Sequence, residues 1–278
     1  MNYGGNSVNI LSDGTLMVDG GYAFGQVPRT EWETQIKPDR RNRVRFAMNS
    51  MVIKTPNANI LVDTGAGSKR TDQLKESHHI NGNKLIRNLK EVGLNARDID
   101  IVVLTHLHFD HSGGCTKLNR SGDAVPIFPK ARHIVQEKCW LEAVSPNERF
   151  QTIFHQDDFV PLEEKGLIEL VDGDSEIAPG VTLKVADGPS KGHQMVLVDM
   201  GSERVVFASD LIPTSHHLQA NFIAAADEFP NETLVQKKEL IDMAMKEGWI
   251  IVFGHGQEHR SGYVEEWNGK PHLLPKEV

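Results

Sequence analysis

The sequence predicts an α/β protein in which helices and strands are packed in layers. Short runs rich in β-branched residues alternate with segments whose apolar residues recur at helical spacing. The chain has 278 residues, which is enough to bury a sizeable core, and its 39% hydrophobic and 24% charged content is ordinary for a globular protein. No repeat or low-complexity tract interrupts the pattern. Alternating elements of this kind are typical of sheets covered by helices.

The first predicted elements lead to one buried strand. Residues 50–62 read as a hairpin, because apolar runs flank the turn residues 56–59. Residues 83–92 carry apolar side chains at helical spacing, and Gly93 stands where a C-terminal cap is expected. The run 99–105 is apolar and β-branched, which predicts a strand buried on both faces.

The second half of the chain repeats this mixture of strands and helices. A helix is expected over residues 232–246, with Asn231 as its N-cap. The remaining strands are expected at 133–135, 167–171, 181–186, 195–198, 205–208 and 249–253.

Four candidate metal ligands follow the strand at 99–105 in an H-x-H-x-D-H string: His106, His108, Asp110 and His111. Side chains alternate along an extended chain, so the first three share one face, and the glycines that follow permit a turn at the fourth. Imidazoles and carboxylates are ligands that Zn²⁺ and other first-row divalent metals prefer. The alternative, ordinary polar loop residues, explains this density after a buried strand poorly.

One string cannot complete the ligand shells of two ions, so further ligands are expected downstream. His193 follows a glycine just before a predicted strand, Asp210 ends the next strand, and His255 follows the last one. Each stands where a loop can aim it at a common site. These three positions strengthen the prediction of a metal centre.

Together, the string, the later Gly-His, the strand-terminal Asp and the final Gly-His resemble the metallo-β-lactamase superfamily, from about residue 51 to 255. The resemblance implies an α/β four-layer αβ/βα sandwich, with two mixed β-sheets flanked by helices. It implies a single domain over residues 1–278, in which residues 1–47 form an N-terminal arm that contacts a dimer partner or the substrate pocket.

The resemblance also implies two divalent metal ions, with zinc expected and Mn, Fe or Co left open. Asp63, in a D-x-G sequence, would support the ligands without binding metal. The implied ligands are His106, His108 and His193 for the first ion, Asp110, His111 and His255 for the second, and Asp210 as the bridge.

Two-metal chemistry of this kind provides a metal-bridging hydroxide that attacks a scissile carbonyl, with Asp110 as the catalytic proton acceptor. The strings at residues 19–28, 210–214 and 255–260 are similar to those of the quorum-quenching N-acyl homoserine lactonases of bacilli. We therefore expect a lactonase that acts on a small-molecule lactone or ester. A phosphotriester or aryl-ester hydrolase and a non-catalytic metal-binding protein are the alternatives.

One position departs from that lactonase pattern. The better-known lactonases place a tyrosine three residues after the bridging aspartate, where it assists the substrate carbonyl, and this chain has Pro213 there. Either another donor takes its place, with His216 expected as the catalytic donor and His217 as the alternative, or the substrate differs. A separate apolar set is expected to line an acyl pocket or to belong to the core: Tyr22, Phe24, Met48, Met51 and Phe109.

Charge and composition exclude some classes of partner. The net charge of −8 disfavours nucleic acid, because phosphate binding needs a basic surface. No apolar run approaches the ~20 residues that span a bilayer, and the first residues lack the pattern of a signal peptide. Two cysteines suit a reducing compartment. We expect a cytoplasmic protein with no nucleic-acid or membrane partner, and a homodimer formed through the N-terminal arm.

Overall fold

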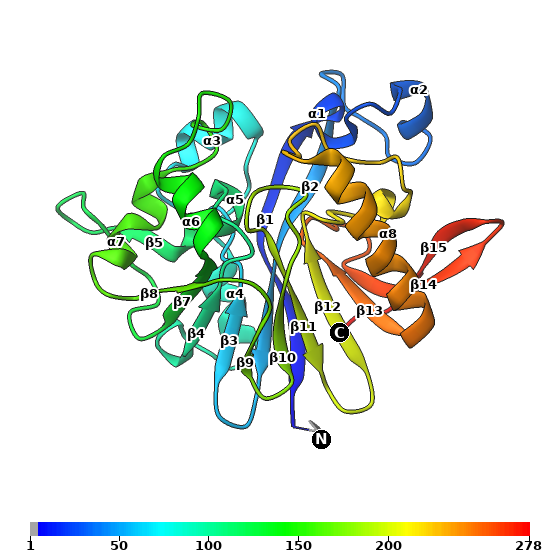
Figure 1. Cartoon of the computed structure of the whole chain (residues 1–278). Coiled ribbons are helices and arrows are strands. Elements are labelled where there is room, and N and C mark those ends of the chain that lie inside the picture. Colours follow the sequence, from blue (N-terminus) through cyan, green and yellow to red (C-terminus); the bar gives the residue numbers. More distant parts are fainter. Residues whose placement is uncertain (1–4) are drawn as a thin grey trace.

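The computed structural model describes residues 5–278, and its main feature is a pair of mixed β-sheets packed face to face (Figure 1). In the first sheet the pairs on the β1 side are antiparallel and the pairs from β3 onward are parallel. Its six strands, in spatial order, are β1 (Ser7–Asp19), β2 (Arg43–Lys54), β3 (Asn59–Val62), β4 (Ile101–Val103), β7 (Arg132–Gln136) and β8 (Ile168–Val171).

The second sheet is antiparallel except at one pair of neighbours. Its seven strands, in spatial order, are β15 (Lys270–Pro275), β14 (Ser261–Trp267), β13 (Trp249–Phe253), β12 (Arg204–Ser209), β11 (Gln194–Asp199), β10 (Val181–Val185) and β9 (Ser175–Ala178). The parallel pair is β12 and β13. A separate small hairpin consists of β5 (Thr116–Leu118) and β6 (Ala124–Pro126).

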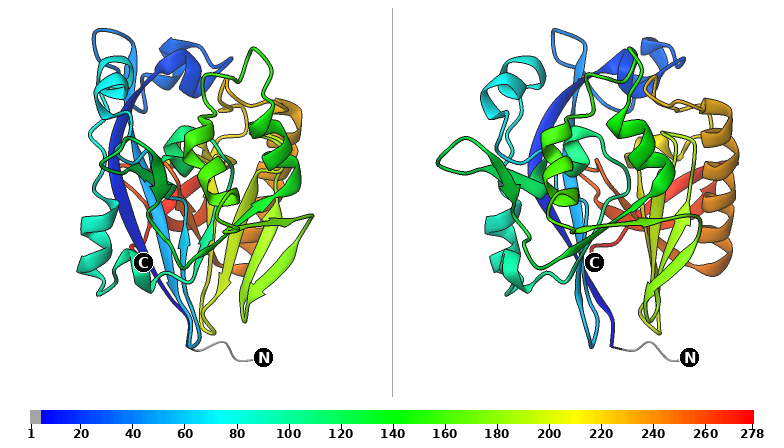
Figure 2. Two further views of the ribbon diagram at one scale, coloured as in Figure 1. Left: turned by 90° about the vertical axis from the view of Figure 1, so that its left-hand side faces the viewer. Right: turned by 60° about the vertical axis from the view of Figure 1, so that its left-hand side comes forward.

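Helices cover the two outer faces of the pair of sheets (Figure 2). On the first sheet these are α4 (Leu85–Glu91), α6 (Glu137–Val144) and α7 (Val160–Glu163), and on the second sheet it is α8 (Pro230–Glu247). The remaining helices are α1 (Gly20–Phe24), α2 (Arg29–Trp32), α3 (Thr71–His78), α5 (Phe109–Ser112), η1 (Ala96–Asp98), η2 (Gly113–Cys115), η3 (Gln156–Asp158) and η4 (Ser215–Leu218). Within residues 5–278, no helix is long and apolar enough to cross a membrane.

The alternation of side chains along buried strands produces the layers. On β2, Met51 faces the core between the sheets, whereas Val52 faces the core beneath α4 and α6. On β12, Phe207 joins the core between the sheets and Val206 packs on the α8 side. Strands that are apolar on both faces therefore hold two sheets and two helical layers together. The predicted four-layer αβ/βα sandwich is confirmed.

Most predicted elements that lead to the H-x-H-x-D-H string (residues 106–111, called the metal string below) are present. The hairpin forms from β2 and β3, the helix is α4, and the buried strand is β4. The predicted N-cap at Asn231 was wrong, because α8 begins at Pro230, two residues before the predicted start at 232, and its N-cap residue Phe229 makes no side-chain hydrogen bond to the helix. Proline fits this position because the first turn of a helix leaves its N–H groups without partners within the helix.

The structure differs most from the prediction in the described part of the N-terminal segment, which was predicted to be an arm. Residues 7–19 form β1, which pairs along its length with β2 of the same chain. The polar sequence around Asp13 hid this strand, because a register shift occurs there and the buried Asp13 accepts hydrogen bonds from three backbone N–H groups. The first four residues of the expected arm lie outside the described residues.

Candidate metal centre

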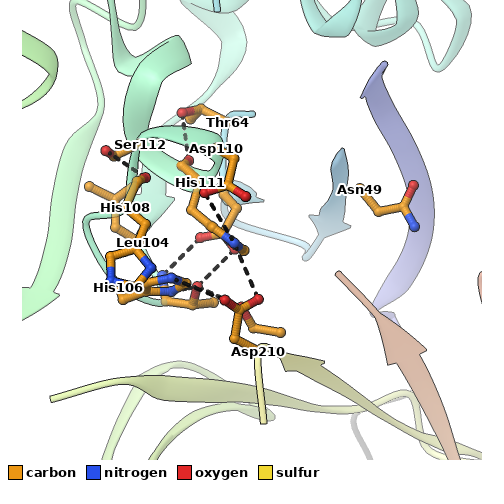
Figure 3. Close-up of polar contacts among 12 residues, drawn as sticks. Asn49, Thr64, Leu104, His106, His108, Asp110, His111, Ser112 and Asp210 are labelled. Atoms are coloured by element: carbon orange, nitrogen blue, oxygen red, sulfur yellow. Dashed lines mark hydrogen bonds and ion pairs between the residues drawn. The ribbon is translucent and has the colours of Figure 1, made fainter. Parts of the chain in front are cut away.

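The metal string leaves the end of β4 and turns into α5, and Asp210 approaches it from the end of β12 (Figure 3). Two residues beside the site have a left-handed backbone: Asp63 at φ 56° and Ser209 at φ 47°. Such a conformation costs free energy for a residue with a side chain, and it persists where the surrounding structure fixes it. Here it turns the chain at the ends of β3 and β12, so that the carboxylates of Asp63 and Asp210 both contact His111.

Asp210 is the centre of the cluster. Its Oδ1 lies 3.3 Å from Nε2 of His111 and 3.0 Å from Nε2 of His255, and its Oδ2 lies 3.5 Å from Nε2 of His106. Asp110 is farther out, with its carboxylate oxygens 4.0 Å from His111 Nε2 and 3.8 Å from His255 Nε2. One carboxylate therefore contacts histidines from two segments that are far apart in the sequence, the string at 106–111 and His255.

A second layer of hydrogen bonds orients the rings. Four of the five histidines among the candidate ligands form a hydrogen bond through Nδ1 to another protein atom. Their Nε2 atoms are thereby left to face the centre of the cluster. The Nδ1 partners are Thr105 Oγ1 for His106 at 3.1 Å, Asp63 Oδ2 for His111 at 2.8 Å, the Ala186 carbonyl for His193 at 3.2 Å and the Ala47 carbonyl for His255 at 2.7 Å. Asp63 also accepts hydrogen bonds from the backbone N–H and the hydroxyl of Thr105, so it ties β3 to the metal string.

The glycines after the string are required by close packing. Gly113 has φ −58°, an ordinary helical value. A Cβ atom on it would lie 2.4 Å from the carbonyl oxygen of Ala66, and one on Gly114 would lie 2.2 Å from that of Thr64. The string therefore packs directly against the loop after β3. The sequence alone indicates backbone freedom as the reason for these glycines. At Gly113 close packing is the stronger reason for a glycine, because its φ is ordinary.

Burial and charge divide the histidines into two groups. Burial lowers the pKa of His106 well below its usual value, and it lowers the pKa of His108 and of His193 to about 4. Burial also acts to lower the pKa of His111 and of His255, but the negative charges of Asp210 and Asp110 and the close contact with the Asp210 carboxylate together outweigh it and raise both. Metal binding requires all five rings to be neutral, so bound cations would replace protons at the last two.

The donor set fits divalent metal ions. Two groups of three residues bring their ligand atoms within 4.8 Å of one another: His106, His111 and Asp210, and also Asp110, His111 and His255. The buried Nε2 of His106 and Oδ1 of Asp210 lie at ion-pair distance from other candidate ligands, but neither makes a hydrogen bond of good geometry among residues 5–278. Such buried polar atoms are costly unless something positive binds them.

The two remaining predicted ligands lie beside these groups. The His108 ring is 4.3 Å from the His106 ring, centroid to centroid, and the His193 ring is 5.3 Å from it. His193 Nε2 accepts the backbone N–H of Asp210 at 3.3 Å. All seven predicted ligands thus converge on one place, and their division between two ions stays a prediction.

The cluster opens into a cavity of about 440 Å³. Asp110, Asp210 and His255 line the end of the cavity beside the candidate metal centre, which we call its metal end. Apolar side chains form most of the remaining walls. Those apolar residues include Leu16, Val18, Phe46, Phe109 and Ile153. Of the five residues considered for an acyl pocket, Tyr22 and Phe109 line this cavity, whereas Phe24, Met48 and Met51 are buried in the core. An apolar cavity with a few polar groups at one end is typical of a small-molecule site.

The two histidines after Pro213 occupy different surroundings. His217 is buried, with Nδ1 bonded to Thr214 Oγ1 at 2.8 Å and Nε2 bonded to the Ala23 carbonyl at 3.0 Å, so both nitrogens are engaged within the fold. His216 is half-buried and lines a second, more polar cavity of about 380 Å³ on the η4 side of His255. Its predicted role as a donor to the substrate stays a prediction.

Sequence reasoning missed several polar residues of the first cavity, among them His78 and Asp227. His78, at the end of α3, is half-buried in the cavity wall. Asp227 is buried in the same wall, just before α8. Neither stands in a motif, and only the packing of distant segments brings them to the site, so the sequence alone carried no signal for either.

Comparisons with known proteins bear on the family and the fold of this chain. A sequence profile of the Metallo-beta-lactamase superfamily matches residues 44–255. An N-acyl homoserine lactonase from Bacillus cereus is 26% identical over 228 residues, which cover 76% of this chain and 82% of the relative. The N-acyl homoserine lactonase AiiA from Bacillus thuringiensis subsp. kurstaki is 25% identical over 219 residues, covering 74% of this chain and 80% of the relative.

Solved structures share the whole fold. A probable metal-dependent hydrolase from Staphylococcus aureus has a TM-score of 0.89 at 26% identity, and the match covers 100% of this chain and 99% of that chain. AidC, a dizinc quorum-quenching lactonase solved with the product N-hexanoyl-L-homoserine, has a TM-score of 0.82 at 18% identity, with 100% and 97% covered. At 18% identity, the match to AidC shows a shared fold and no more.

Proposed function

Because the chain belongs to the metallo-β-lactamase superfamily, we propose that it is a dinuclear metal-dependent hydrolase that opens lactone rings, with N-acyl homoserine lactones as its substrate class. The observation that carries the proposal is the cluster of seven candidate ligands at the end of an apolar-walled cavity. An acylated lactone matches that arrangement, because its carbonyl meets the metal end and its acyl chain meets the apolar walls. The lactonase relatives support this substrate class.

The proposed ions are zinc, as in the dizinc lactonase of the same fold. His106, His108 and His193 would hold one ion, Asp110, His111 and His255 would hold the other, and Asp210 would bridge them. When bound, two divalent ions supply a Lewis acid for the carbonyl oxygen and lower the pKa of water to near neutrality. Asp63 orients His111 for this role through its Nδ1.

Asp110 moves the proton in the proposed reaction. Its carboxylate lines the cavity and lies within 4.0 Å of two candidate ligands. The oxygen of water adds to the lactone carbonyl carbon and the ring C–O bond breaks. Asp110 accepts a proton from that water and transfers it to the departing ring alkoxide, so the product is a hydroxy acid.

The substrate class is tested by a panel of acyl homoserine lactones, aryl esters and phosphotriesters, with the chelated protein as the control. We expect metal-dependent ring opening with kcat/KM highest for the acyl homoserine lactones. A phosphotriester or an aryl ester as the best substrate would overturn the substrate class and leave the metal centre in place. No turnover of any compound by the metal-loaded protein would favour the non-catalytic alternative.

The proposed role of His216 as a hydrogen-bond donor to the substrate carbonyl has its own test. His216→Ala should lower kcat for lactones by about 100- to 1,000-fold, in the range of a lost donor to a developing charge. His259→Ala, in the same polar cavity, is the matched control and should leave kcat unchanged. Equal activities of both variants and the wild type would remove His216 from the mechanism.

The homodimer, the quorum-quenching role and the cytoplasmic location remain predictions from the sequence. Sedimentation at several concentrations tests the first of them.

The role proposed for the N-terminal segment is contact with the substrate pocket. Leu16, Val18 and Tyr22 support it, since they line the cavity of their own chain.

A further inference from the structure

Asp227 is a carboxylic acid in the cavity wall that belongs to no metal-binding motif. It is buried, with 6% of its surface exposed, and it lines the same cavity as Asp110 and Asp210. The residues around it lie in the irregular segment between η4 and α8. The proposed chemistry at the metal end does not use this group, so its presence in a largely apolar wall needs another reason.

Backbone hydrogen bonds fix the segment that carries Asp227. The N–H of Ala225 donates to the carbonyl of Tyr22 on α1 at 2.9 Å, and the N–H of Glu228 donates to the carbonyl of Pro189 at 3.1 Å. Pro189 belongs to the loop that leads to the candidate ligand His193. Asp227 is therefore held between α1 and the loop of a candidate ligand.

Among residues 5–278, only one oxygen of Asp227 has a hydrogen-bond partner. The hydroxyl of Thr233 donates to Oδ2 at 2.5 Å. Within residues 5–278, the structure gives Oδ1 no hydrogen bond and gives the carboxyl no ion pair. The nearby Lys237 is fully buried, but its Nζ donates to the carbonyls of Gln219 at 3.0 Å and Phe222 at 2.7 Å. Thr233 and Lys237 thus stabilise the carboxyl without occupying Oδ1.

Buried carboxyl groups are costly to desolvate, and where one oxygen is left free toward a cavity the free oxygen is available to a ligand. Burial raises the pKa of Asp227 to about 7. In either protonation state the carboxyl retains lone pairs that accept a hydrogen bond. The complementary ligand group is therefore an N–H or O–H donor.

We infer that Asp227 is a specificity-determining residue whose Oδ1 accepts a hydrogen bond from an amide N–H on the carbon beside the scissile carbonyl. This inference rests on the proposed function, since it deepens the choice of substrate at the same site. The lactone carbonyl is at the metal end of the cavity, and the amide is one atom away from it along the substrate. Asp227 selects amide-bearing lactones over lactones with a plain alkyl substituent.

The test compares two substrates with wild-type protein and two variants. The substrates are N-hexanoyl homoserine lactone and the γ-lactone in which a CH₂ group replaces the amide N–H. Asp227→Leu removes the acceptor and Asp227→Asn retains a carbonyl oxygen. The wild type should prefer the amide substrate by about 10- to 100-fold in kcat/KM, mainly through KM. Asp227→Leu should lose this preference, and Asp227→Asn should retain most of it.

The remaining outcomes separate this inference from the proposed function. If the wild type hydrolyses neither lactone, the proposed function fails. If it hydrolyses both equally well, or if Asp227→Leu weakens both substrates by the same factor, the proposed function stands and the role of Asp227 is overturned. The substrate comparison on the wild type keeps the test decisive even if Asp227→Leu does not fold, which circular dichroism would show.

Discussion

Asp210→Ala should abolish nearly all hydrolysis while the fold survives. The carboxylate of Asp210 lies within 3.5 Å of Nε2 atoms from three histidines, so its removal takes away the proposed bridge between two ions and leaves those rings facing one another. Loss of a residue that acts as part of a catalytic unit costs on the order of 10⁴-fold in kcat. Metal content should fall from two ions toward one per chain.

Asp242→Ala is the matched control for that experiment, since Asp242 is an exposed aspartate on α8, away from the cavity. It should retain wild-type kcat and metal content. Steady-state kinetics on a lactone substrate and elemental analysis provide both readouts, and circular dichroism checks the fold. Activity of Asp210→Ala within tenfold of the wild type would show that the bridging role is misassigned.

Lys69→Met should destabilise the protein more than any surface substitution. The Lys69 ammonium is buried and lies 2.8 Å from Oδ1 of the buried Asp158. It also donates to the carbonyls of Gly113 at 2.6 Å and Thr116 at 3.0 Å, just after the metal string. Removing one partner of a buried ion pair costs about 3–5 kcal/mol, because the other charge stays buried. Arg70, 2.9 Å from Asp158, should hold the loss near the lower end.

Chemical denaturation measures the free energy of unfolding of this variant. Lys138→Met is the control, because Lys138 is largely exposed and lies 3.9 Å from its acidic neighbour Asp187. Exposed pairs of this kind contribute about 0–1 kcal/mol. A loss below about 1 kcal/mol for Lys69→Met would contradict the view that the buried ammonium anchors the loop after the metal string.

The parts of the molecule that sequence predicted well have local causes. The β2–β3 hairpin and β4 have continuous apolar runs, and the metal string follows β4 directly, so neighbouring residues contain the whole signal. His193, Asp210 and His255 each lie beside a strand that was predicted in sequence. The edges of the second sheet at β9 and β15 were not predicted, because their strands are short or largely exposed and lack clean alternation.

Features that depend on distant segments escaped the prediction. β1 becomes a strand by pairing with β2, and its polar centre at Asp13 is satisfied by N–H groups more than 50 residues away. Asp227 reaches the cavity because its segment packs on α1 and on the loop before His193. The same non-local packing separates Tyr22, which lines the cavity, from Phe24, which is buried two residues later.

The most direct test of the metal centre is anomalous diffraction from crystals of the zinc-loaded protein, recorded on both sides of the zinc absorption edge. The proposed site predicts two zinc peaks per chain, one on each side of the Asp210 carboxylate, with histidine nitrogens at about 2.0–2.1 Å. One ion should contact His106, His108 and His193, and the other should contact Asp110, His111 and His255. A single peak, or zinc bound away from Asp210, would contradict the dinuclear site on which the proposed hydrolysis depends.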